Sequence, residues 1–266
     1  MTESSVYFMD DEREAGRLES KVDASHWVAQ YLQKYLDTAN AILDVGCGPG
    51  VIACQVARNA PHASVTGIDV SEQRIALAHE RFADVDNAES KCADATDIPF
   101  PDKSFDLIYC RFLLEYLPDP ALAVKEMSRV LRPGGRILLQ DLDGQLLWHW
   151  PIEPKLQQGI EHVVQALAAT GFDPHVGRKL YSHLVTRQLE NIEVNVEPYH
   201  LYAGAIDEVS MRLWKLKLDI ARPAAVRALG SEVAAVNLVS RFLEYLHRDD
   251  TLTYSTVFTV TGMKAK

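Results

Sequence analysis

The sequence predicts an α/β fold in which helices cover both faces of a mostly parallel sheet. Short apolar runs typical of buried strands alternate with amphipathic helical patterns through the first 142 residues. Parallel neighbours need crossover connections, and the intervening helices supply them. No repeat, low-complexity tract or flexible linker divides the 266 residues. We therefore expect a single domain over 1–266.

Each element up to residue 142 has its own local signal. An amphipathic helix over 26–36 follows a capping Asp23 or Ser25, and Ser71 caps another helix that runs to about Phe82. A helix over 120–131 stops at the turn Arg132-Pro133-Gly134-Gly135. A further helix is expected at 51–59, and strands are expected at 41–45, 65–70, 91–95, 105–110 and 136–142.

After Asp143 the pattern changes to longer helices and wider spacing. Helices are expected over 153–169 and 176–190, and strands over 192–196 and 252–262. An insert over 203–250 separates the two strands, and its second half has the wide apolar surface of a helix. Its first half, MRLWKLKLDI, alternates like a strand but also has apolar residues at helical spacing, and we favour the helix.

Composition limits the classes of partner. A net charge of −10 and a pI near 5.4 argue against a nucleic-acid partner, which needs clustered Lys and Arg. No run of 18 apolar residues predicts a membrane span, and the amino terminus lacks a signal-peptide pattern, so a cytoplasmic protein is expected. The histidines and carboxylates show no metal-binding spacing, and we expect no metal.

The strongest chemical signal is the glycine loop Asp44-Val45-Gly46-Cys47-Gly48-Pro49-Gly50 after the first strand. Alternate glycines let the backbone approach a ligand closely, and the next helix points free N–H groups toward it. Gly48, Gly50 and Ala53, with Asp69 downstream, also fit a dinucleotide fingerprint. That fingerprint normally begins directly after the strand, and Gly46-Cys47 intervene here. The loop alone leaves both ligands open.

Further segments resemble one family. ILDVGCGPG (42–50), VTGIDVS (65–71), CADATDIPFPDKSFDLIYC (92–110), LLEYLPDP (113–120) and VLRPGGRILLQD (130–141) are similar to class I S-adenosylmethionine-dependent methyltransferases, in the group that resembles the ubiquinone and menaquinone biosynthesis enzymes. The resemblance implies a Rossmann-like three-layer sandwich with seven strands, the last antiparallel. It also implies a helical cap over 1–38, a cofactor-binding core over 39–142, and a substrate side over 143–266 with a helical lid in the insert.

The resemblance assigns cofactor contacts to particular positions. Gly46, Gly48 and Gly50 would surround the methionine part of S-adenosylmethionine, and Asp44 would lie near its ammonium. Asp69 would accept bonds from both ribose hydroxyls, while Val70, Asp94 and Ala95 would meet the adenine. For Arg111 only a main-chain role is carried over. Arg17, in an expected helix over 12–19, would pair with the cofactor carboxylate if that helix covers the site. Asp69 and Asp94 would alternatively only cap local turns.

No motif marks a catalytic base. Methyl transfer depends mainly on holding donor and acceptor in line, and a base matters when the acceptor is a hydroxyl or carbon acid. His149 lies just past the fifth strand and is the first candidate, although packing between Trp148 and Trp150 would equally explain it. Weaker candidates are Glu115, Tyr116, His183, His200 and Tyr7.

The expected function is methyl transfer from S-adenosylmethionine to a small, mostly apolar organic molecule in secondary metabolism. Tyr202, Met211 and Trp214 of the insert would roof the acceptor pocket. Whether oxygen, nitrogen or carbon is methylated stays open, as does the oligomeric state. The alternatives are a cofactor-binding interaction protein without turnover and, less favoured, an NAD-dependent oxidoreductase.

Overall fold

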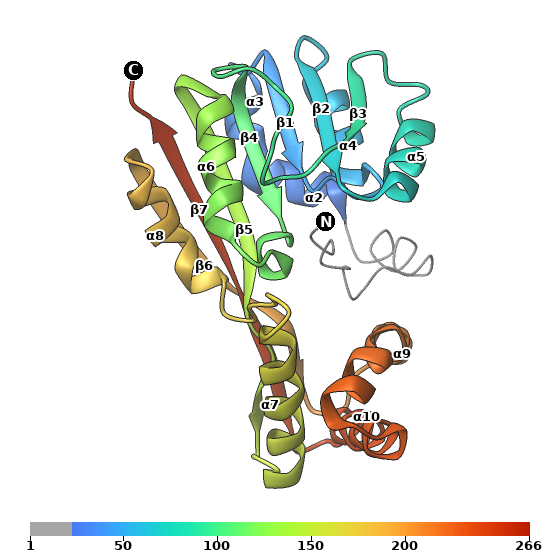
Figure 1. The fold of residues 1–266 in the computed structure, drawn as a ribbon. Coiled ribbons are helices and arrows are strands. Elements are labelled where there is room, and N and C mark those ends of the chain that lie inside the picture. The colour runs from blue at the N-terminus through green and yellow to red at the C-terminus, as the bar shows by residue number, and fades with distance from the viewer. Residues whose placement is uncertain (1–22) are drawn as a thin grey trace.

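The computed structural model describes residues 23–266, and a seven-stranded sheet organises them (Figure 1). The strand order is β3-β2-β1-β4-β5-β7-β6, and β7 runs antiparallel to both of its neighbours while the first five strands are parallel. This confirms the predicted sheet and its antiparallel last strand. The strands are β1 Ala41–Val45, β2 Ser64–Asp69, β3 Ala88–Cys92, β4 Phe105–Arg111, β5 Leu131–Trp150, β6 Leu189–Ala203 and β7 Leu252–Lys264.

Helices cover both faces of the sheet, as the alternating pattern predicts. One face carries α2 (Ala24–Trp27), the π-helical turn η1 (Val28–Leu32), α3 (Gln33–Leu36), α4 (Val51–Asn59) and α5 (Glu72–Arg81). The other face carries the short η2 (Leu114–Tyr116), α6 (Pro120–Val130), η3 (Gly177–Lys179) and α8 (Leu180–Thr186). The predicted caps are in place, because Asp23 accepts a bond from the His26 N–H (2.9 Å) and Ser71 from the Arg74 N–H (3.4 Å).

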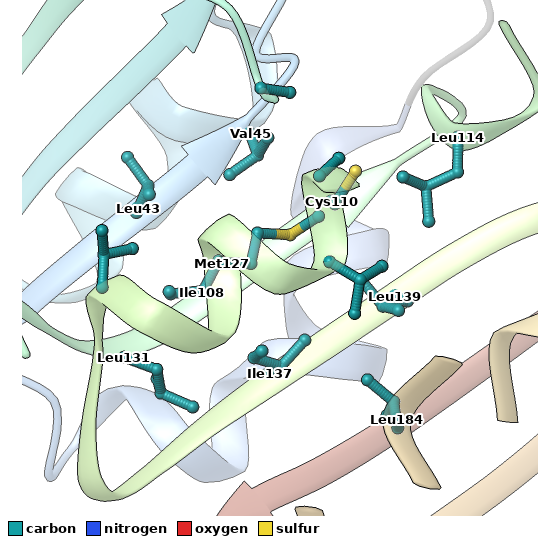
Figure 2. Close-up of a cluster of buried hydrophobic side chains, with 14 of the residues drawn as sticks. Leu43, Val45, Ile108, Cys110, Leu114, Met127, Leu131, Ile137, Leu139 and Leu184 are labelled. Atoms are coloured by element: carbon teal, nitrogen blue, oxygen red, sulfur yellow. The ribbon is translucent and has the colours of Figure 1, made fainter. Parts of the chain in front are cut away.

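The core under α6 and α8 is a continuous apolar layer. Figure 2 shows Leu43, Ile108 and Leu139 from three neighbouring strands packed against Met127 of α6, with Leu184 of α8 closing the far side. These side chains are fully buried. This layer holds the strands of the sheet together. Because the first five strands are parallel, their carboxyl ends all lie at one edge of the sheet.

Several predicted boundaries are wrong. β5 is 20 residues long rather than the seven of 136–142, and β6 spans 15 residues rather than five. β3 begins three residues earlier than expected, at Ala88. The helix expected over 176–190 ends at Thr186, because Leu189 already pairs with Lys264 of β7. The helix expected over 12–19 lies outside the described residues.

The extra length of β5, β6 and β7 builds a second layer of structure beyond the carboxyl edge of the sheet (Figure 1). Here α7 (Pro154–Ala168), α9 (Glu208–Leu229) and α10 (Glu232–Leu246) share a separate apolar cluster; we call these helices and the strand ends beside them the distal unit. The stretch MRLWKLKLDI is helical within α9, as favoured. Trp214, Phe242 and Tyr245 form the buried centre of the unit.

The strands change register where they enter the distal unit. The pairing of β5 with β7 shifts register between Asp143 and Trp148, and the pairing of β6 with β7 shifts between Tyr199 and Tyr202. Gly144 (φ 75°) and His200 (φ 50°) adopt left-handed backbone there. No helix in the described part of the chain is long and apolar enough to cross a membrane.

Candidate functional site

The glycine loop between β1 and α4 is tied tightly to the neighbouring strand. The N–H groups of Gly46 and Cys47 both donate to the Ile68 carbonyl of β2, at 2.8 and 2.9 Å. Gly48 has φ 54°, a left-handed conformation that glycine adopts without steric cost. The loop therefore stays in one shape at the carboxyl end of β1, as expected for a ligand cradle.

The three glycines of the loop lack a side chain for different steric reasons. A Cβ at Gly46 would lie 2.9 Å from Leu113, and a Cβ at Gly50 would lie 2.8 Å from Phe82. These two positions let the loop pack against its own protein. A Cβ at Gly48 would meet no atom of residues 23–266 within 4 Å, although Gly48 itself is buried. Of the three glycines, Gly48 is thus the one beside which the described residues leave space.

Asp69 at the end of β2 holds the loop and still has capacity for a ligand. Its Oδ2 accepts from the Gly48 N–H and its Oδ1 from the Ser71 N–H, both at 3.0 Å. A carboxylate oxygen has two lone pairs, so each oxygen retains one. Val70 beside it is 66% exposed, which is unusual for a valine in an otherwise packed segment. The ribose contact expected of Asp69 and the adenine contact expected of Val70 stay predictions.

Asp94 and Ala95 follow β3 at the same edge. One oxygen of Asp94 accepts from both the N–H and the hydroxyl of Thr96 at 2.8 Å, so Asp94 does cap a local turn. Its other oxygen accepts no bond from the described residues, and the side chain is exposed. Ala95 is buried below it. The turn geometry therefore leaves one carboxylate oxygen for an amino group.

Asp44 is buried beneath the loop. Burial raises the pKa of its carboxyl to about 7, with Asp69 adding to the rise and the nearby Tyr109 hydroxyl opposing it. A cationic ligand group would favour the ionised form. Burial also raises the pKa of the neighbouring Cys47 thiol well above its usual value, which disfavours the thiolate form.

The side chain of Arg111 at the end of β4 is the centre of a polar and aromatic network that sequence reasoning missed. Its guanidinium carbon lies 4.0 Å above the Phe112 ring and 5.8 Å from the Trp27 ring. Its Nε donates to Gln140 Oε1 at 3.0 Å, and Trp27 Nε1 donates to the same oxygen at 2.7 Å. A further hydrogen bond joins the guanidinium to Tyr199 of β6. Burial lowers the pKa of Arg111.

A series of rings leads from this network into the distal unit. Phe112, which has a left-handed backbone (φ 53°), meets Tyr199 edge-on with centroids 5.4 Å apart. Tyr199 is followed by His200 (4.2 Å), then Trp214 of α9 (5.1 Å), then Phe242 of α10 (5.5 Å). Aromatic residues directly after strand four and near the end of strand six were the available signal. The sequence named His200 and Trp214 but could not show that they meet.

A hollow of about 280 Å³ lies on the same sheet face, between η1 and α3 on one side and β5, β6 and β7 on the other. Tyr31, Tyr35 and Thr259 are among its lining residues. Gln140 separates it from Arg111, because its Nε2 donates to Thr259 Oγ1 (2.7 Å) while its Oε1 accepts from Arg111. The hollow is therefore distinct from the carboxyl edge of the sheet.

The structure places His149 inside the distal unit. Its Nδ1 lies 3.1 Å from Thr253 Oγ1, and its ring meets Phe242 and Tyr245 at 5.5 and 5.4 Å. Gln140 pairs with Thr259 and His149 with Thr253, so the two are six residues apart along β7 (259 − 253), about 20 Å at strand spacing. His149 is thus packed among rings at a distance from the glycine loop.

The other expected site residues are scattered. Glu115 is buried beside Asp141, whose Oδ2 accepts the Glu115 N–H at 3.3 Å. His183 lies on α8, where burial lowers its pKa. Arg17 and Tyr7 lie outside the described residues. Among residues 23–266 no group of three or more His, Cys, Asp or Glu side chains is arranged to hold a metal ion.

Comparison with known proteins agrees with this geometry. Residues 43–139 match the methyltransferase domain family. The 27-O-demethylrifamycin SV methyltransferase of Amycolatopsis mediterranei is 40% identical over 109 residues, which are 40% of each chain. The demethylmenaquinone methyltransferase of Staphylococcus aureus is 43% identical over 98 residues, 36% of this chain and 40% of its own. The matched stretch thus spans about two fifths of the length of these relatives.

The fold extends further than the sequence similarity. A phosphoethanolamine N-methyltransferase of Haemonchus contortus, solved with phosphomonomethylethanolamine and S-adenosylhomocysteine, aligns with 100% of this chain and 61% of its own. The TM-score is 0.60 at 18% identity, which shows a shared fold. The glycine loop, Asp69 and β4 all lie within the matched domain. Residues 43–139 therefore form a domain of the methyltransferase family, and the fold of the described residues agrees with this.

Proposed function

We propose that this protein transfers the methyl group of S-adenosylmethionine to a small, mostly apolar organic molecule. The observation that carries the proposal is the glycine loop inside the matched domain, where the described residues leave space beside Gly48, and where Asp69 keeps two acceptor positions. The named relatives supply the acceptor class: one is named for 27-O-demethylrifamycin SV and the other for demethylmenaquinone.

In this proposal, residues at the carboxyl ends of β1 to β4 would hold the cofactor. Gly46, Gly48 and Gly50 would hold the methionine part and Asp44 its ammonium, with the Arg111 carbonyl beside it. Asp69 would hold the ribose, and Val70, Asp94 and Ala95 the adenine. When bound, S-adenosylmethionine supplies a methyl group on a positively charged sulfur. The work left to the protein is to hold the acceptor in line and exclude water.

The acceptor side is supported by the ring series from Phe112 to Phe242. These rings connect the end of β4 to the distal unit, and α9 and α10 lie beyond the carboxyl ends of the strands (Figure 1). Aromatic walls suit flat or apolar ligands. The net charge of −10 disfavours a nucleic-acid acceptor. We assign His149 to packing rather than to catalysis, because its ring contacts lie in the distal unit.

The direct test is transfer of label from [methyl-³H]S-adenosylmethionine to a panel of hydroquinones, naphthols, aromatic amines and aromatic acids. We expect extractable labelled product with at least one class, and much less product from the matched Asp69→Asn variant at the same folded concentration and at a donor concentration below its Kd. Tight S-adenosylhomocysteine binding by calorimetry should accompany it. Binding without transfer to any acceptor in the panel would contradict the proposed enzyme and support the binding-only alternative.

A further inference from the structure

Arg111 carries a positive charge in an unusual setting. Its polar partners in the described chain are neutral oxygens, the amide of Gln140 and the hydroxyl of Tyr199, and its flat faces meet the rings of Phe112 and Trp27. Among residues 23–266 no carboxylate lies within ion-pair distance of its guanidinium. A cation that is removed from water loses its hydration and is stabilised by a nearby anion. Neutral oxygens supply only part of that stabilisation.

The nearby acids do not supply that anion. Asp44 and Asp141 are felt by the guanidinium only through space, and more weakly than Tyr199. Burial disfavours the ionised form of both carboxyls, because it raises the pKa of Asp44 to about 7 and that of Asp141 above its usual range. The end of β4 thus presents a net positive group at the carboxyl edge of the sheet.

The direction of the side chain decides which ligand this group faces. The glycine loop follows β1, on one side of β4, whereas Gln140 and Tyr199 lie on β5 and β6, on the other side of β4. The Arg111 side chain therefore points away from the glycine loop and toward the series of rings that begins at Phe112. Phe112 holds a left-handed backbone (φ 53°), which costs energy for a residue with a side chain and keeps its ring under the guanidinium.

We propose that Arg111 is a specificity-determining residue that binds an acidic oxygen of the acceptor, the anion of a phenol, an enol or a carboxylic acid. The inference rests on the proposed function and names the acceptor class for the same site. A guanidinium presents paired N–H donors in a plane, the geometry that suits a carboxylate or an aromatic oxygen anion. The rings of Phe112 and Tyr199 would hold the flat apolar body of the same molecule.

Binding can be tested before any acceptor is known. The probes are 2-naphthoate and 2-naphthylmethanol, which share a ring system and differ in charge, titrated by calorimetry into protein saturated with S-adenosylhomocysteine. We expect the wild type to bind 2-naphthoate at least about tenfold tighter than the alcohol, since a charged hydrogen bond is worth about 1.5–3 kcal/mol. Arg111→Gln should remove that preference. The matched control Arg58→Gln, an exposed site on α4, should retain it.

Other outcomes overturn the inference. A preference for 2-naphthoate that survives in Arg111→Gln would show that another group binds the anion. Equal binding of the two probes by the wild type, or none, would contradict an acidic-oxygen site. If Arg111→Gln binds S-adenosylhomocysteine more than tenfold more weakly than the wild type, the guanidinium contributes to the donor site instead. Should Arg111→Gln fold poorly, Arg111→Lys keeps the charge without the planar fork, and it should lower the preference at least threefold.

Failure of this inference is separable from failure of the proposed function. If the labelling panel yields a methylated amine or carbon acid with no acidic oxygen, and Arg111→Gln keeps the wild-type kcat/KM on it, the methyltransferase proposal stands and the role of Arg111 falls. If S-adenosylhomocysteine binds but no label is transferred, the proposed function falls in the labelling assay, whatever the naphthoate titration shows.

Discussion

Replacement of Asp69 by asparagine should weaken S-adenosylhomocysteine binding by roughly 30- to 150-fold. Asparagine keeps one acceptor oxygen, so one of the two expected ribose bonds and the negative charge are lost, a cost of about 2–3 kcal/mol at 1.4 kcal/mol per tenfold. The structure adds a second effect. Asp69 also accepts from Gly48 and Ser71, and an amide cannot accept on both sides. We therefore expect Tm of the free protein to fall by about 5 °C.

The measurement is titration calorimetry at equal folded fraction, verified by circular dichroism. Asp94→Asn is the matched control, because Asp94 is exposed and its amide oxygen can keep the bonds from Thr96. This control should change the affinity less than about fivefold, since a neutral hydrogen bond is worth only about 1 kcal/mol. Affinity within threefold of wild type for Asp69→Asn, in a folded protein, would refute the ribose assignment.

Further outcomes follow from the same geometry. Gly48→Ala costs about 1–2 kcal/mol of backbone strain at φ 54° and places a methyl group in the space beside the loop, so calorimetry should show S-adenosylhomocysteine bound at least tenfold more weakly. Because burial raises the pKa of Asp44 to about 7, its carboxylate is lost as pH falls through that value; S-adenosylhomocysteine affinity should decline below pH 7, and Asp44→Asn should flatten the profile measured by calorimetry. Trp214→Ala empties the centre of the distal unit at a cost of about 3–5 kcal/mol, so thermal unfolding should begin about 10 °C lower while S-adenosylhomocysteine affinity stays unchanged. A flat pH profile in the wild type would contradict the ammonium contact of Asp44, and a loss of cofactor affinity in Trp214→Ala would show that the distal unit supports the donor site.

Local sequence signals were sufficient to predict the elements that carry the glycine loop and Asp69. β1 and α4 begin and end where the sequence predicts, because an apolar run, a glycine loop and an amphipathic stretch follow one another without ambiguity. β4 differs from its prediction by one residue. The glycines and Asp69 lie in these elements, and their neighbours are within a few residues in sequence or on the adjacent strand. Their place at the carboxyl ends of β1 and β2 was therefore predictable from the sequence, while their ligand contacts stay predictions.

Features that depend on contacts between residues far apart in the chain could not be predicted from the sequence. β5 continues past Gly144 because β7 pairs with it again at Trp148–Trp150, and no local pattern in 143–150 shows that partner. His149 was expected near the donor because the strand was expected to end at 142. The environment of Arg111 is assembled from Trp27, Gln140 and Tyr199, which lie on three elements far apart in the chain. Its charge was visible in the sequence, but the neutrality of its surroundings was not.

The path of the chain through β5 and β6 restricts how the distal unit can be exchanged with the corresponding part of a relative. The chain leaves the core at Gly144, returns after Ala168, leaves again near His200 and returns at Ser255. The apolar cluster of the distal unit joins Leu156 and Ile160 from the first excursion to Trp214 and Phe242 from the second. A chimera that replaces only one excursion would pair mismatched halves of that cluster. Both would have to be moved together, with the outgoing junctions at the irregular stretches 144–147 and 199–202 and the returning junctions after Ala168 and at Ser255.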